Sequence, residues 1–476
     1  MAPAEGLTSL LWVSVCSVLA PAWLGAGVVR FIGLSSSDGW RQFAFWSYLV
    51  GQVVQAALTA LWLAAGKPVP GPCLPLVAFA LGSCLILRVR RSAAGSGARR
   101  VPRDPWICAL AAILVLIHMD QCLLRNLHPI ISTDEASIWS SKARLLYSAD
   151  DMGSWFSLHY ARNPSYPMFN PLMQVLAYAS SGRVLWWENR LPLQAFSLTV
   201  LLQLSAVVEQ MLPRWLGAVL LIAFASSSSL LSWGSTVYSD LLVGCTLLAV
   251  MCAWMRFEAE RERMPWRLFC LSLCGLLSSK HEGFMLAIAF AVAVVSTRAL
   301  LKKRLLPASL GMDWWWALAP AAAVLAGQWF NWHFGLSSRP DAPAFAHVSK
   351  VADLIGVLPR MASHIPQAFQ SYASLLLEIG VTRWLLALGA LSPLLWRRGS
   401  LEPARAWSWA AIALSLGGYV LVYACIATDQ GDAREAARRL EWYAKYGFDR
   451  TMLHMLPAAV LALALNLRRD ARMHGT

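Results

Sequence analysis

The sequence predicts an all-α protein that crosses a membrane many times. Of its 476 residues, 58% are hydrophobic, only 14% are charged and 24 are tryptophan, a composition unlike that of a soluble globular domain. Long apolar runs recur along the chain, and most approach the ~20 residues that a membrane-spanning helix needs. We therefore expect a polytopic helical membrane protein with about 11–14 membrane segments.

Eleven apolar runs are long enough to predict membrane spans. In chain order they lie near residues 8–29, 43–65, 70–88, 105–125, 190–211, 215–232, 237–255, 281–299, 313–334, 405–428 and 451–467. Three shorter runs lie near residues 170–186, 266–279 and 384–396. Each of these three is compatible with a short span, a re-entrant segment or a juxtamembrane helix.

Basic residues predict which side of the membrane each loop faces. The net charge of +14 comes from short basic segments beside apolar runs, which is typical of cytoplasmic loops and disfavours nucleic acid as a partner. The loop 88–104 holds six arginines and one aspartate, so we expect it in the cytoplasm. Counting spans from this loop places the long loop that starts near residue 126 outside, together with 335–380 and 429–450. For the middle of the chain, the count of spans agrees with the positions of the charged loops only if the segment 170–186 does not cross the membrane.

Two parts of the chain are distinguished by this pattern. Residues 1–104 look like an N-terminal transmembrane extension that ends in the basic loop, and residues 105–476 form a larger unit. The N-terminus lacks the features of a cleaved signal peptide, so we expect the first span to be retained. Ten cysteines fall mostly in apolar runs, with no zinc-site spacing and no disulfide framework.

One segment of this outer loop opens with a pair of carboxylates, Asp134 and Glu135, followed by Trp139 and Lys142. The pattern of apolar residues predicts a short helix lying at the membrane interface. In one interpretation Thr133 or Asp134 only caps this helix. In the other, one carboxylate is a general base or a metal ligand, with Trp139 and Lys142 one or two turns further on.

Three other places put polar residues at the edges of apolar runs. The proline-rich stretch around Tyr166 is either a loop anchored by aromatic residues or part of a substrate-binding surface. Arg190 and Asp240 are each a boundary residue that reaches toward water or a functional group. These alternatives remain open from the sequence alone.

Lys280, His281 and Glu282 interrupt apolar sequence, where each charge costs about 2.5–3.5 kcal/mol on insertion scales. They form either the tip of a helical hairpin with a Lys–Glu pair or a cavity in which Lys280 faces an anion such as phosphate. Arg450 and His454 are four residues apart, so they share one helix face. Arg450 suits a phosphate because its fork donates two hydrogen bonds, but an interfacial anchor is the alternative.

Several reaction classes lack their motifs in this chain. It contains no phosphate-binding glycine loop, no HExxH and no GxSxG, which disfavours a nucleotide-driven pump, a zinc protease and an α/β-hydrolase. A transporter or flippase for a lipid-linked sugar remains an alternative, but it should carry charges near mid-span and related halves, and neither is visible here. A membrane subunit without chemistry is a third possibility.

The order of these motifs resembles a known family. TDEASIWSSKARLLY, YPMFNPL, NRLP, YSD, SSKHEG and FDRTMLHMLP follow one another from about residue 105 to 468. In this order the chain resembles the bacterial branch of GT-C membrane glycosyltransferases, which is related to protein O-mannosyltransferases and lipid A aminoarabinose transferases. The three spans before residue 104 depart from the simplest family arrangement, and a soluble C-terminal domain is absent.

The resemblance implies an inner-membrane enzyme with a periplasmic active site. It would transfer a sugar from a polyprenyl-phosphate carrier to a lipid, glycan or protein acceptor. In the family an acid of the first large outer loop is the base or a metal-binding residue, a role that falls on Asp134 with Glu135 beside it. Lys280 or Arg450 would hold the carrier phosphate. A divalent metal ion is compatible with paired acids and phosphate, and no nucleotide site is needed.

Overall fold

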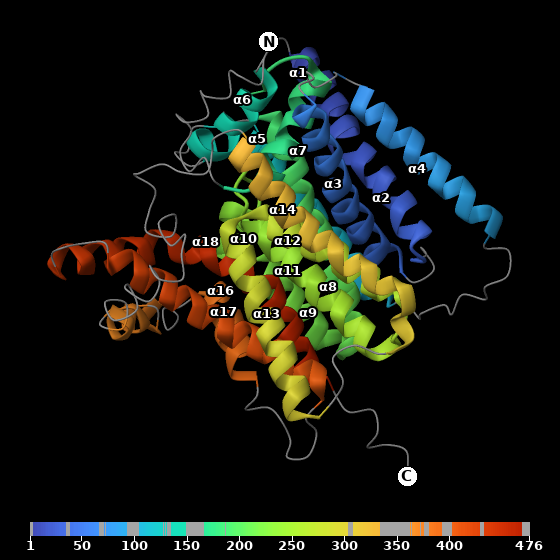
Figure 1. Cartoon of the computed structure of the whole chain (residues 1–476). Helices are drawn as coiled ribbons and strands as arrows, with labels where there is room; N and C mark the ends of the chain where they lie inside the picture. The colour runs from blue at the N-terminus through green and yellow to red at the C-terminus, as the bar shows by residue number, and fades with distance from the viewer. Residues whose placement is uncertain are drawn as a thin grey trace.

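The computed structural model is built of helices, with no strand among the residues it describes. Eight of the described helices are long and apolar enough to cross a membrane, so the prediction of an all-α polytopic membrane protein is confirmed at that level (Figure 1). The described residues are 3–34, 39–65, 71, 73–92, 104–126, 128, 130, 135–148, 166–185, 187–302, 308–333, 362, 364–371, 373–375, 380–392, 402–428 and 433–468.

The N-terminal helices form a closely packed layer at one side of the bundle. They are α1 (Pro3–Ser14), a π-helical turn η1 (Val15–Leu19), α2 (Ala20–Phe31), α3 (Trp40–Ala64) and α4 (Cys73–Ser92). A Cβ atom at Gly25 would lie 1.8 Å from the carbonyl oxygen of Ser47, and one at Gly51 equally close to that of Pro21. Glycine at these two positions therefore lets the backbones of α2 and α3 touch, as small residues do in membrane helix pairs.

The next segments lead to the candidate site. Helix α5 (Pro105–Asn126) leaves most of its apolar side chains on the outside of the bundle, as a lipid-facing helix does. It is followed by η3 (Glu135–Ser140), α6 (Ser141–Ser148), α7 (Phe169–Ser181), η5 (Glu188–Arg190) and α8 (Leu191–Met211). The described helical segment 135–148 has the position of the predicted short interfacial helix, although its first turns are π-helical.

The predicted single span at 215–232 is wrong. Helix α9 (Arg214–Ala225) ends after 12 residues, and α10 (Ser228–Trp233) follows as a separate short helix. The break coincides with four consecutive serines, and the hydroxyl of Ser227 donates a hydrogen bond back to the carbonyl oxygen of Phe224 at 2.7 Å. Such bonds from serine to the preceding turn compete with helix continuation.

The centre of the bundle is α11 (Asp240–Glu260), which is buried on nearly every side. Helices α12 (Arg263–Ser279) and α13 (His281–Leu300) follow it. A 3₁₀ stretch, η6 (Ala308–Ala317), precedes α14 (Leu318–His333), so the apolar run predicted at 313–334 becomes a regular α-helix only from Leu318. Figure 1 shows α14 lying across α12 on the near side of the bundle.

The C-terminal part consists of α16 (Val381–Leu391), α17 (Pro403–Thr428) and α18 (Ala433–Leu467). Helix α18 has 35 residues, and its segment Gly447–Leu467 can span a membrane. Figure 1 shows α18 entering the bundle from outside it, where it packs against α11, α16 and α17. A Cβ at Gly244 would lie 2.5 Å from the carbonyl oxygen of Leu453, so glycine permits close contact between α11 and α18.

Buried ion pairs join the helices at the end of the bundle opposite to the start of α11. Arg41 at the start of α3 pairs with Glu209 near the end of α8, and Arg298 near the end of α13 pairs with Glu258 near the end of α11 at 2.5 Å. Exposed Arg214 pairs with Asp104. These contacts fix which helix ends lie together, and they leave the starts of α8, α11 and α13 at the other end.

Candidate functional site

Asp240 is the centre of a buried group of charges. It is the first residue of α11 and is only 1% exposed. Its Oδ1 accepts hydrogen bonds from Lys280 Nζ at 2.9 Å and from His454 Nε2 at 2.8 Å, and its Oδ2 accepts one from Arg450 Nε at 3.1 Å. Lys280 also pairs with Glu282 Oε1 at 3.0 Å. We call Asp240, Lys280, Glu282, Arg450 and His454 the Asp240 cluster.

Local backbone features bring these residues together. Lys280 is extended (φ −166°, ψ 161°) and separates α12 from α13, so its side chain can turn toward the start of α11. Arg450 and His454 share one face of α18, as their spacing predicts. The close packing at Gly244, one turn after Asp240, brings that face near. Three segments far apart in the sequence thus meet at one carboxylate.

His454 is held from both sides of its ring. Its Nδ1 is hydrogen-bonded to the hydroxyl of Tyr419, and its Nε2 lies against Asp240. The tautomer consistent with this geometry has the proton on Nε2, so that His454 donates to the carboxylate and accepts from Tyr419. His454 then provides a neutral donor to the Asp240 carboxylate, and the two positive charges next to Asp240 are those of Lys280 and Arg450.

Aromatic rings cover the guanidinium group of Arg450. Its Cζ lies 4.1 Å from the ring centre of Tyr238 and 5.6 Å from that of Trp233. A cation near an aromatic face is stabilised by the negative charge of the ring face. The side chain of Arg450 nevertheless remains 19% exposed, so it is less deeply buried than Asp240.

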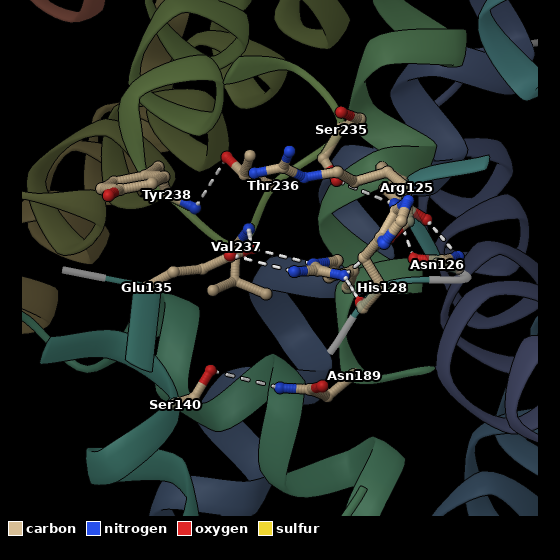
Figure 2. A network of polar contacts seen from close by, with 12 residues as sticks. Arg125, Asn126, His128, Glu135, Ser140, Asn189, Ser235, Thr236, Val237 and Tyr238 are labelled. Atoms are coloured by element: carbon tan, nitrogen blue, oxygen red, sulfur yellow. Dashed lines mark hydrogen bonds and ion pairs between the residues drawn. The ribbon is translucent and has the colours of Figure 1, made fainter. Parts of the chain in front are cut away.

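A second buried pair joins the first outer segment to the start of α8. Glu135, which is 0% exposed, accepts hydrogen bonds from Arg190 Nε at 2.8 Å and Nη2 at 3.0 Å. Arg190 Nη1 donates to the carbonyl oxygens of Arg125 and His128. Glu135 Oε1 also accepts a hydrogen bond from the backbone N–H of Val237 at 3.0 Å. Figure 2 shows the Glu135 carboxylate beside Val237, with the hydrogen bonds of the guanidinium group leading from it toward His128 and Arg125.

The segment 235–239 connects this pair to the Asp240 cluster. Val237 donates its N–H to Glu135, and its carbonyl oxygen accepts from Asn170 Nδ2 at 2.6 Å. Asn170 also donates to Ser239 Oγ at 2.9 Å, and Asp240 is the next residue. Helix α7 therefore starts beside the start of α11. The residues that follow α7 contact Glu135, which lies at the same end of the bundle. Both ends of α7 thus lie at one end of the bundle, as predicted for a segment that does not cross the membrane.

Aromatic rings lie between the Glu135–Arg190 pair and the Asp240 cluster. They belong to Trp139 and Tyr166, and Lys142 lies next to them. The rings of Trp139 and Tyr166 stack at 5.6 Å, and the Tyr166 ring meets the edge of His281, next to Glu282, at 5.0 Å. Lys142 Nζ lies 5.5 Å from the Tyr166 ring centre. Burial lowers the pKa of the Lys142 ammonium to about 7, because the charged form loses its contact with water.

The structure thus brings together ten of the eleven residues that the sequence singles out, and Asp134 lies outside the described residues. The interpretation of Arg190 and Asp240 as boundary residues that reach toward water is wrong, since each is 1% exposed and ion-paired. Glu135 is also not available for direct chemistry in this arrangement, because both its oxygens already accept hydrogen bonds. Its geometry is that of a positioning residue.

Sequence reasoning missed the polar residues that connect the two groups. Asn170, Gln174 and Asn189 form a buried chain of side-chain hydrogen bonds with Ser140 and Tyr178. Asn170 and Gln174 are four residues apart in an otherwise apolar helix, which is a signal that such residues share a face and bond to something inside the protein. Tyr419 offered no comparable signal.

The possible metal site remains a prediction. Among the described residues, no group of three or more histidine, cysteine, aspartate or glutamate side chains is arranged to hold an ion. Comparison of the chain with protein-family models, with curated proteins and with solved structures found no match.

Proposed function

We propose that the protein is a GT-C-like membrane glycosyltransferase of a bacterial inner membrane. It transfers a sugar from a polyprenyl-phosphate carrier to a lipid, glycan or protein hydroxyl on the periplasmic side. The observation that supports this most is the Asp240 cluster, in which one buried aspartate holds Lys280 and Arg450 at the end of the bundle where the Glu135 segment also lies.

The two cations suit a phosphate that leaves during sugar transfer. Asp240 fixes Lys280 and Arg450 in place before any ligand arrives, and fixed charges stabilise developing negative charge without reorganisation. The Arg450 side chain remains partly exposed, and the planar fork of a guanidinium group matches the geometry of phosphate oxygens. Apolar helix surfaces, such as the outer face of α5, are compatible with a polyprenyl chain in the surrounding lipid.

Asp134 is the proposed general base. It precedes Glu135, whose pairing with Arg190 anchors this part of the loop. The acceptor hydroxyl oxygen attacks the anomeric carbon and its proton passes to Asp134. The bond from the anomeric carbon to the phosphate oxygen breaks, and the electron pair leaves with the polyprenyl phosphate beside Lys280 and Arg450. Atoms and charge balance without a nucleotide.

The proposal is tested by replacing Asp134 with asparagine. The Asp134→Asn variant should lose at least about 100-fold in sugar transfer, since general bases contribute roughly that much or more. The measurement is mass spectrometry of products formed in membranes supplied with polyprenyl-phosphate sugars. Asp120→Asn is the matched control, because it makes the same substitution at an exposed aspartate of α5. Transfer by Asp134→Asn at the rate of the control would reject the assignment of Asp134.

The alternative function is transport of a lipid-linked sugar. The starts of α11 and α13 carry Asp240 and Lys280 at helix ends rather than at mid-span, which favours an enzyme. Proteoliposomes distinguish the two functions, since a flippase moves a labelled polyprenyl-phosphate sugar between leaflets without forming a new glycosidic bond.

A further inference from the structure

The carboxylates of the site differ in how many of their oxygens accept hydrogen bonds. Both oxygens of Asp240 and both of Glu135 accept hydrogen bonds. Glu282 accepts from Lys280 through Oε1, but its Oε2 is buried and has no hydrogen-bond partner in the described part of the chain. A buried acceptor without a donor is costly, so Oε2 marks a position where a donor group is missing.

Glu282 is also the most accessible of these carboxylates. Its side chain is 21% exposed, whereas those of Asp240 and Glu135 are almost completely buried. Glu282 lies in the first turn of α13, immediately after Lys280 and His281. A ligand held by Lys280 or Arg450 would therefore meet Glu282 as the next polar group.

A buried hydrogen-bond donor without a partner among the described residues lies on the other side of the contact between Tyr166 and His281. Trp139 is 1% exposed, and its indole Nε1 has no hydrogen-bond partner among the described residues. The Trp139 ring stacks on Tyr166, and Tyr166 contacts His281 next to Glu282. A hydroxyl group is both a donor and an acceptor, so a ligand with several hydroxyl groups offers the partners that these two positions lack.

Charge favours a neutral donor at Glu282 Oε2. The Asp240 cluster already contains two carboxylates and two cations, with His454 as a neutral donor. A phosphate oxygen near Oε2 would be repelled, whereas a hydroxyl adds a hydrogen bond without adding charge.

We propose that Glu282 is a specificity residue that accepts a hydrogen bond from a hydroxyl of the sugar on the polyprenyl-phosphate donor. This inference rests on the proposed function and deepens it, since it separates recognition of the sugar from recognition of the phosphate. Lys280 and Arg450 hold the phosphate, and Glu282 distinguishes a carrier that bears a sugar from one that does not.

Binding to the purified protein in lipid nanodiscs tests this. The probes are polyprenyl phosphate alone and polyprenyl phosphate bearing glucose, galactose, mannose or arabinose. Glu282→Gln, which keeps the side-chain size, should weaken binding of the best sugar-bearing probe by about tenfold, the effect of one lost hydrogen bond to a charged acceptor. Binding of polyprenyl phosphate alone should change by less than about twofold, because this probe makes no such bond.

The control variant is Glu262→Gln, which makes the same substitution at an exposed glutamate before α12 and should leave the affinity for both probes unchanged. An equal loss for both probes in Glu282→Gln, or no loss for either, would overturn the role of Glu282 and leave the proposed function standing. Absence of binding of every probe to the wild-type protein would overturn the proposed function, and this inference with it.

Discussion

At the scale of single residues, the Glu135–Arg190 pair is expected to matter more for stability than an exposed ion pair. Removing one partner leaves a buried charge without compensation, which costs about 3–5 kcal/mol. We therefore predict that Arg190→Met lowers the free energy of unfolding by about that amount. The measurement is denaturant unfolding in mixed micelles.

Arg214 provides the matched control for this prediction. It is 57% exposed and pairs with Asp104, which is itself partly exposed, and exposed pairs contribute about 1 kcal/mol or less. Arg214→Met should therefore have a small effect. The double variant Glu135→Met, Arg190→Met should regain part of the stability that Arg190→Met loses, because it removes both charges. Similar small losses in Arg190→Met and Arg214→Met would show that the buried pair contributes no more to stability than an exposed one.

The sequence indicated most residues of the site but not how they are used. Charges such as Lys280 and Arg450 stood out because apolar sequence surrounds them, and burial of charge requires a partner. Which carboxylate each cation would choose depends on helix packing, which residue type and spacing do not encode. Glu135 illustrates this, since it looked equivalent to its neighbour Asp134 in the sequence and is fully occupied in the structure.

At the scale of helices, the contact of α11 with α18 sets the geometry of the Asp240 cluster. A methyl group at Gly244 would meet the backbone carbonyl of Leu453, which cannot move without shifting α18. We predict that Gly244→Ala destabilises the protein by about 1–3 kcal/mol, the usual cost of overpacking. Sugar transfer should also fall, since His454 follows Leu453 and would move away from Asp240.

Gly417→Ala is the control for this helix contact. Gly417 lies within α17, and a Cβ there has no atom within 4 Å, so alanine should be neutral or stabilise the helix slightly. Both variants are compared by unfolding in mixed micelles and by product formation. Equal behaviour of the two would mean that α11 and α18 tolerate a wider separation.

Helix boundaries were the least predictable elements. Hydropathy found the long spans but treated residues 215–232 as one run, because serine is tolerated in apolar windows. The helix ends where serine hydroxyls bond to the preceding turn. For Lys280 the sequence left two interpretations, the tip of a helical hairpin or a residue that faces an anion in a cavity. In the structure Lys280 is extended between two helices, and its side chain is oriented by the contact with Asp240.

At the scale of the whole molecule, the contacts divide the bundle into two ends. One end holds the Asp240 cluster and the Glu135–Arg190 pair, and the other holds Arg298 paired with Glu258. The basic loop 88–104 predicts that the second end faces the cytoplasm. Charge counting along the sequence thus gives a prediction of orientation, whereas the meeting of distant segments at one carboxylate could not be predicted from the sequence.

Cysteine labelling tests this orientation. We predict that Gly153→Cys, in the loop before Tyr166, reacts in intact spheroplasts with a membrane-impermeant maleimide. Ser96→Cys, in the basic loop, should react only after the membrane is opened, because the positive charge of that loop predicts a cytoplasmic position. The background is a variant without the ten native cysteines. Reaction of Ser96→Cys in intact spheroplasts would invert the proposed topology.

The arrangement of Asp240, Lys280 and Arg450 also has a consequence for biosynthesis. The ribosome makes α11 and the α12–α13 junction some 170 residues or more before it reaches Arg450. Until the last helix enters the bilayer, Asp240 lacks two of its donors, and unpaired charge in lipid is unfavourable. Nascent chains that stop before residue 447 would thus expose a defect that membrane quality-control proteases can recognise.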